Sequence, residues 1–151
     1  MSAIEHLKAL AWKRSREKHP SLPEHARVIH KYKDNTANGL TKCVIDWITF
    51  NGYRADRISS AGRYIEGEKI KGVNGNVQLK GSFVPGPTRK GYADINATIK
   101  GRSVMIEIKM KDKMSEAQIK FKEAEERAGG IYIVVHSFEE FLTEYKKIMT
   151  L

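Results

Sequence analysis

Two neighbouring segments of alternating apolar and polar residues constrain the fold of this chain more than any other feature. Segments 92–100 and 103–110 show the period-two pattern that is typical of half-buried strands. Gly101 and Arg102 lie between them, and a glycine at the first central position favours a type II′ turn. The sequence therefore predicts a β-hairpin, and its register fixes which side chains share a face.

A turn at Gly101–Arg102 pairs Asp94 with Lys109 and Asn96 with Glu107 across the hairpin. These four side chains then project from one face of the sheet. The other face is apolar and is made of Ile95, Ala97, Ile99, Val104, Ile106 and Ile108. Asp94 and Glu107 become diagonal neighbours, ~7 Å apart between backbones, and two carboxylates at that separation can share one metal ion.

Carboxylate oxygens on one face are the ligands that a hard cation such as Mg²⁺ takes. Lys109, on the same face, could orient a water bound to the ion or stabilise charge on a phosphate under attack. The same residues also fit the solvated face of a half-exposed hairpin, with Asp94 and Lys109 as an ordinary cross-strand ion pair.

The sequence after the hairpin favours the site over the solvated face. Ser115-x-x-Gln118 is a capping box that opens a helix ending at Gly129–Gly130, and residues 131–135 form an apolar, β-branched run typical of a buried strand. A strand that leads into such a right-handed crossover usually lies inside its sheet. Polar side chains there are costly unless they line a cleft.

Further helices and a strand complete the expected α/β fold. Apolar residues at helical spacing predict a helix over 38–50, a strand is expected over 53–59, and Ser137 caps a final helix. The core order is α-β-β-β-α-β-α, which predicts a mixed β-sheet flanked by helices.

Residues 1–34 are expected to form a basic helical extension, and 35–151 the main domain. The capping box Ser2-x-x-Glu5 and apolar residues at helical spacing predict an amphipathic helix to about Lys18. Segment 61–91 holds seven of the twelve glycines and several lysines and arginines. It is expected to be a mobile basic loop with a short strand near 77–79.

Composition limits the kind of partner. Lys+Arg 27 against Asp+Glu 18 gives a net charge of +9, and 40% hydrophobic residues exclude a disordered basic tail. A basic folded domain predicts a polyanionic partner. The single cysteine excludes a disulfide framework and a Cys-rich zinc site, and no apolar run is long enough for a signal peptide or a membrane helix. A cytoplasmic protein with no membrane partner is expected.

A family resemblance follows from these motifs. Gly91-Tyr92-Ala93-Asp94 with Glu107-Ile108-Lys109 resembles the Asp…Glu-X-Lys core of the PD-(D/E)XK nuclease superfamily. The Ser115-x-x-Gln118 helix and the strand over 130–135 are similar to its virus-type replication-repair (VRR-NUC) branch. The resemblance covers roughly residues 38–146 and implies a restriction-endonuclease-like core.

The resemblance also implies roles for particular residues. Asp94, Glu107 and the Ile108 carbonyl would bind Mg²⁺ or Mn²⁺, with Lys109 as the catalytic lysine. Gln118 would be an active-site residue, although as the third residue of its helix it can also simply close the capping box. The family usually has a glutamate near the start of the first helix, where this chain has Asn38. This difference leaves open whether one or two metal ions bind.

The expected function is therefore that of a metal-dependent DNA endonuclease, a hydrolase selective for DNA structure, in replication, recombination or repair. Contacts to the DNA backbone phosphates are expected from basic residues of the 61–91 segment and the first helix: Lys69, Lys71, Lys80, Arg89, Lys90, Lys13 and Arg14. Two alternatives are a catalytically impaired nuclease-fold DNA-binding module or complex subunit, and a protein-interaction adaptor. A homodimer is compatible with cutting both strands, but nothing in the sequence marks one. The expected location is nucleoid-associated, or the host-cell cytoplasm for a viral protein.

Overall fold

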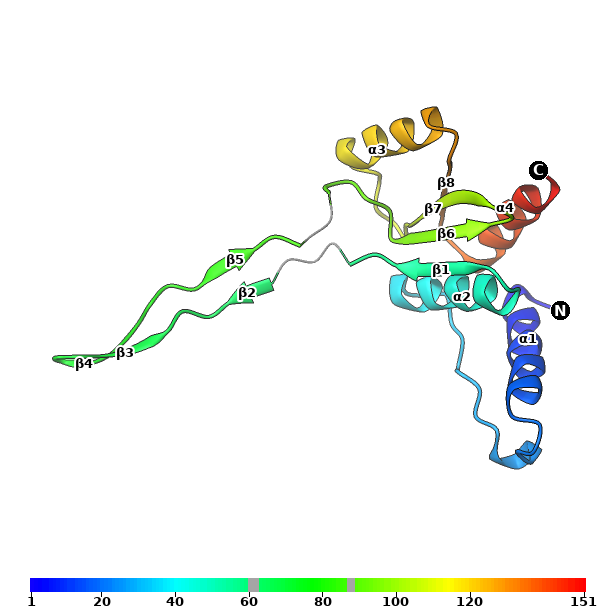
Figure 1. Ribbon diagram of the computed structural model, residues 1–151, viewed down its shortest axis with the longest axis horizontal. Helices are drawn as coiled ribbons and strands as arrows, with labels where there is room; N and C mark the ends of the chain where they lie inside the picture. The colour runs from blue at the N-terminus through cyan, green and yellow to red at the C-terminus, as the bar shows by residue number, and fades with distance from the viewer. Residues whose placement is uncertain (60–62, 87–88) are drawn as a thin grey trace.

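The computed structural model describes residues 1–59, 63–86 and 89–151, and a four-stranded sheet organises the body of the chain (Figure 1). Its strands are β1 (Arg54–Arg57), β6 (Ile95–Ile99), β7 (Arg102–Ile108) and β8 (Ile131–Val135), in the order β1-β6-β7-β8. The β1–β6 and β6–β7 pairs are antiparallel and the β7–β8 pair is parallel. The predicted mixed sheet flanked by helices is thus confirmed.

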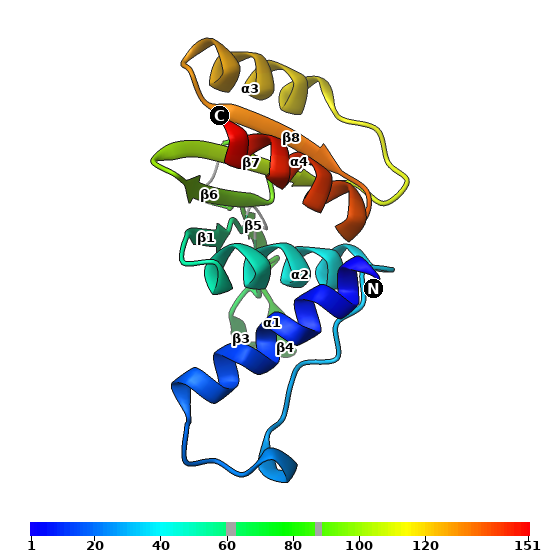
Figure 2. The same cartoon turned by 90° about the vertical axis from the view of Figure 1, so that its right-hand side faces the viewer.

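Helices cover both faces of this sheet. The helices α1 (Ala3–Lys18), α2 (Ala37–Phe50) and α4 (Phe138–Thr150) share one core with the apolar face of the β6–β7 hairpin. The crossover helix α3 (Glu116–Arg127) covers the opposite face, where Phe121 packs against Tyr132. Figures 1 and 2 show α3 and α4 on opposite sides of β8. The face with the polar residues of the hairpin is therefore the α3 side.

The hairpin register differs from the predicted one. Pairing runs from Ile95–Ile106 to Ile99–Arg102, so the turn residues are Lys100 and Gly101. Both have positive φ, 51° and 78°, as a type I′ turn requires, so the predicted type II′ turn at Gly101–Arg102 and its pairing of Asp94 with Lys109 are wrong. Lys100 adopts a left-handed conformation that sequence rules assign to glycine. The shift is two residues, which preserves the face of every side chain.

A long β-ribbon, which we call the arm, occupies most of the segment predicted as a basic loop. Its strands are β2 (Arg63–Ile65), β3 (Lys69–Gly72), β4 (Gly75–Gln78) and β5 (Ser82–Val84). The β2–β5 pair lies nearer the body and the β3–β4 pair forms the far end of the ribbon, which projects away from the body (Figure 1). The expectation of a loop with one short strand is thus wrong for the described residues. Residues 61, 62, 87 and 88 of that segment lie outside them.

The N-terminal segment packs onto the main body. The predicted capping box of Ser2 and Glu5 is present, and Ala3, Leu7 and Ala11 of α1 are buried in the core shared with α2 and α4. Asp34 accepts a hydrogen bond from the backbone nitrogen of Phe138 at 3.0 Å, at the start of α4. None of the helices in the described part of the chain has the length and apolarity to cross a bilayer.

Candidate metal-binding active site

Glu107 is a charged side chain inside the sheet. It lies on β7, between β6 and β8, with only 2% of its surface exposed. Its Oε1 atom accepts a hydrogen bond from Nε2 of Gln118 and lies 3.1 Å from Nζ of Lys109. Its Oε2 atom is buried and has no hydrogen-bond partner among the described residues. An ionised carboxylate with one unsatisfied buried oxygen is costly unless a cation completes it.

Asp94 is held against the same strand. Its Oδ2 atom accepts a hydrogen bond from the backbone nitrogen of Ile108 at 2.8 Å. Its own carbonyl accepts one from Ile58 at 2.8 Å, which continues the β1–β6 pairing. Because Ile95 pairs with Ile106, Asp94 lies at the position across from Glu107. In the observed register the two carboxylates are therefore directly across from each other, whereas the predicted register made them diagonal neighbours.

Lys109 completes the polar face. Its side chain is 14% exposed and forms the ion pair with Glu107, and its backbone nitrogen donates to the Val135 carbonyl at 3.0 Å. The strand end is thus fixed by β8. The Lys109 ammonium group, fixed beside two carboxylates, can stabilise negative charge on a phosphate without a large conformational change.

Gln118 performs both of the roles that the sequence left open. Its Oε1 atom accepts from the backbone nitrogen of Ser115 at 2.9 Å, which closes the capping box of α3. Its Nε2 atom donates at the same time to Glu107. The start of α3 is therefore tied directly to the carboxylate on β7.

Burial and like charge act together on Glu107. Desolvation raises the pKa of its carboxyl group, and the neighbouring Asp94 carboxylate raises it further. Lys109 and the hydrogen bond from Gln118 oppose this rise without cancelling it. A carboxyl pKa that is raised by burial and by a second carboxylate is a common mark of functional sites.

Tyr132 is a further residue of this site that was not predicted from the sequence. This β8 residue pairs with Met105, two residues before Glu107, so its side chain lies on the same face of the sheet. Its hydroxyl is buried without a hydrogen-bond partner in the described part of the chain. Burial, the carboxylates of Glu107 and Asp94, and the approach of the hydroxyl to the Glu107 side chain raise the pKa of this phenol. Strand alternation combined with the parallel register was the signal that could have found it.

These residues suit a hard divalent cation. Asp94 and Glu107 offer carboxylate oxygens, and Oε2 of Glu107 accepts no hydrogen bond of regular geometry from the described residues. No group of three or more Asp, Glu, His or Cys side chains within the described ranges could hold a metal ion alone. Asn38 accepts a hydrogen bond from Arg57 at 2.7 Å, so its oxygen is already engaged. The Ile108 carbonyl remains a predicted ligand.

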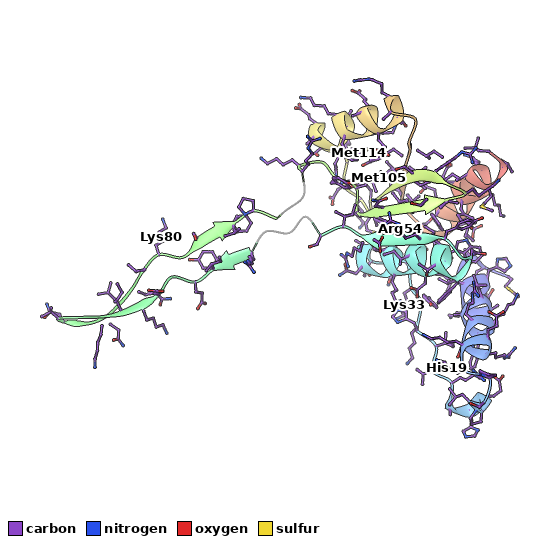
Figure 3. All side chains as sticks on the ribbon, viewed as in Figure 1. His19, Lys33, Arg54, Lys80, Met105 and Met114 are labelled. Carbon is purple, nitrogen blue, oxygen red and sulfur yellow. The ribbon has the colours of Figure 1, made fainter. Side chains whose placement is uncertain are left out.

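The predicted phosphate-binding residues lie in three places. Arg89 and Lys90 line a cavity beside Gln118, and Lys69 and Lys71 lie on β3 of the arm. Lys80, labelled in Figure 3, also lies on the arm. The remaining two, Lys13 and Arg14, lie on α1, on the opposite side of the body from α3. Arg14 is occupied by the Phe50 carbonyl and by Glu17. The structure thus places Arg89 and Lys90 in one cavity with Gln118, and α1 lies on the other side of the body.

Comparisons with known proteins add no assignment. No protein-family model matches the chain. No curated protein matches it significantly.

Proposed function

We propose that this chain is a metal-dependent DNA endonuclease with a restriction-endonuclease-like core. The single observation that carries the proposal is the buried Oε2 atom of Glu107, which lacks a hydrogen-bond partner in the described structure and lies beside Asp94. A divalent cation shared with Asp94 would satisfy this oxygen, and the Tyr132 hydroxyl is a neighbour of the same Glu107 side chain. The motif resemblance of Asp94, Glu107 and Lys109 to the VRR-NUC branch supports the same reading.

Each residue has a defined role in this proposal. Asp94 and Glu107, with the Ile108 carbonyl, hold Mg²⁺ or Mn²⁺, and the bound ion supplies Lewis-acid stabilisation to the phosphate and its attacking water. Lys109 offers a fixed positive charge to the phosphate oxygens as negative charge develops. Gln118 keeps the Glu107 carboxylate in one orientation.

DNA is the substrate class that the charge supports. The net charge of +9 favours a polyanion, and phosphate contacts from Lys and Arg carry little base specificity. We therefore assign selectivity to DNA structure, in replication, recombination or repair inside the cytoplasm of a cell. Cutting of both strands would need a second copy of the chain.

The second candidate is a DNA-binding module with an impaired active site. It is favoured by Asn38, which stands near the start of α2 and whose side-chain oxygen accepts from Arg57. A third acidic ligand is therefore absent at this position. The module would bind DNA with the salt dependence of phosphate contacts and with no need for metal.

A cleavage assay separates the two candidates. Single-stranded, duplex, flap and four-way DNA are incubated with Mg²⁺ or Mn²⁺ and with wild type, Lys109→Ala or Lys111→Ala. Lys111 is an exposed lysine two residues further on and serves as the matched control. The endonuclease predicts metal-dependent cutting that falls roughly 100-fold or more in Lys109→Ala and persists in Lys111→Ala. Binding without cutting on every DNA would establish the impaired module.

A further inference from the structure

We propose that the base of the arm and the start of α3 form a binding site for an unpaired nucleotide, so that strands with unpaired bases are the preferred substrates. This inference rests on the proposed nuclease function and specifies its substrate class. The site is a cavity of ≈ 550 Å³. Its lining includes Phe83, Arg89, Lys90, Gly91, Ala117 and Gln118. Its volume lies within the range of small-molecule binding sites.

Phe83, which lines this cavity, belongs to an exposed aromatic pair. Phe83 on β5 and Tyr64 on β2 are cross-strand partners, so both rings project from the same face of the arm. Their exposed fractions are 64% and 62%. Large aromatic rings with this exposure offer stacking surfaces, and bases stack on such rings irrespective of sequence.

The charge of the cavity matches a nucleotide phosphate. Arg89 and Lys90 are exposed cations, and the described residues of the lining include no carboxylate. An acidic protein segment would pair with the cations but leave the aromatic ring uncovered, and an apolar segment would cover the ring but leave the cations unpaired. A nucleotide uses both halves, because it joins a flat base to a negative phosphate.

Gly91 fixes these cations against α3. Its φ is +85°, and a Cβ atom at this position would lie 2.3 Å from the Ala117 carbonyl oxygen. Only glycine allows the backbone to approach the helix so closely. The segment that carries Arg89 and Lys90 is therefore positioned by a backbone contact.

The cavity and the candidate active site share one residue, Gln118. Gln118 lines the cavity and also donates to Glu107, so a nucleotide in the cavity neighbours a phosphate held at the carboxylates. In a duplex the faces of each base are covered by the adjacent base pairs. Stacking on Phe83 therefore requires an unpaired base, as in a single strand, an overhang or a flap.

The test measures binding by the full-length protein in the absence of divalent metal. Fluorescence anisotropy reports the affinity for a labelled single-stranded oligonucleotide and for the corresponding blunt duplex. Phe83→Ala is expected to weaken single-strand binding about tenfold and to reduce the preference for single strand over duplex. Phe83→Trp should restore the preference. Val84→Ala, the neighbour on the opposite face of the same strand, is the matched control and should bind as wild type does.

Three results from binding and sedimentation would overturn the proposal. The first is an equal loss of affinity in Phe83→Ala and Val84→Ala, and the second is an equal loss of affinity for single strand and duplex. The third is dissociation of a dimer by Phe83→Ala in sedimentation, because the ring would then cover a second copy. Since binding is measured without metal, absence of cleavage on every DNA would refute the nuclease and leave this site standing. Equal cleavage of single-stranded and flap DNA by wild type and Phe83→Ala would refute the nucleotide site and leave the nuclease standing.

Discussion

The side-chain amide of Gln118 donates to the Glu107 carboxylate through its nitrogen while its oxygen accepts the backbone N–H of Ser115. One residue thus closes the cap of α3 and orients a carboxylate on β7. Glutamate is an equally good third residue of a capping box but cannot donate a hydrogen bond to a second carboxylate.

Gln118→Glu should therefore separate the two roles. We expect α3 to remain folded, because the capping box is kept, while the metal-dependent cleavage rate falls at least roughly tenfold through loss of the hydrogen bond to Glu107. Circular dichroism and the initial cleavage rate check the two parts. A variant with wild-type cleavage would show that the contact with Glu107 has no role in the reaction.

Divalent metal should stabilise the folded protein. Asp94 and Glu107 are assembled only in the native sheet, so a bound ion raises the free energy of unfolding by about 2.7 kcal/mol at one hundred times its dissociation constant. Thermal unfolding with and without Mn²⁺ measures the shift in Tm. Asp94→Asn should lose the shift, while Asp112→Asn, at an exposed aspartate outside the site, should keep it. An equal shift in both variants would place the metal elsewhere.

The raised pKa of Glu107 gives its contribution to stability a definite pH dependence. A carboxyl group whose folded pKa lies above its ordinary value of 4.5 binds its proton more tightly in the folded state, so stability falls as pH rises from that value through the raised pKa. Glu107→Gln does not titrate. In metal-free buffer at pH 7, the free energy of unfolding of this variant should exceed that of wild type by about 1 kcal/mol, which corresponds to about 2–4 °C in Tm.

This difference should shrink as the pH falls to 4.5 and below, where the wild-type carboxyl group is protonated in both states. Thermal melts of both proteins over a pH series provide the measurement. A constant difference at every pH would show that burial of the charge is not its cause.

Two glycines with the same backbone conformation separate strain from steric overlap. Gly52 and Gly91 have φ values of +87° and +85°, but only a Cβ atom at Gly91 would meet the backbone of α3. Gly52→Ala should cost about 1 kcal/mol of stability from left-handed strain alone. Gly91→Ala should cost roughly 2 kcal/mol more, because the segment must move away from Ala117. Urea unfolding compares them, and equal losses would mean that the close approach carries no energetic weight.

Local signals predicted most of the body. The caps at Ser2 and Ser115 and the apolar spacing of α2 and α4 depend on residues a few positions apart, and the structure has these four helices at the predicted places, with α3 ending at Arg127, just before the predicted Gly129–Gly130. The predicted assignment of hairpin side chains to the two faces of the sheet was also correct, because a register error of two residues leaves every side chain on the same face. The turn itself was wrong because Lys100 accepts a positive φ.

Long-range pairing was the part that the sequence could not predict. The arm pairs residues such as Arg63 and Val84, and its strands are too short and too rich in glycine for period-two signals to be read. The proximity of Gln118 to Glu107 depends on how α3 crosses the sheet. The unsatisfied oxygen of Glu107 and the buried hydroxyl of Tyr132 depend on packing, which no spacing rule supplies.

The arm leaves the body between two strands that are already adjacent. Arg57 pairs with Ile95, so the excursion begins and ends at neighbouring positions of one ladder. Insertions, deletions or wholesale exchange within the ribbon therefore leave the hydrogen bonds of the sheet, and the carboxylates that it carries, in place. In the proposed nuclease, changes in the arm could therefore alter which nucleic-acid shapes are bound while the carboxylates on β7 stay in place.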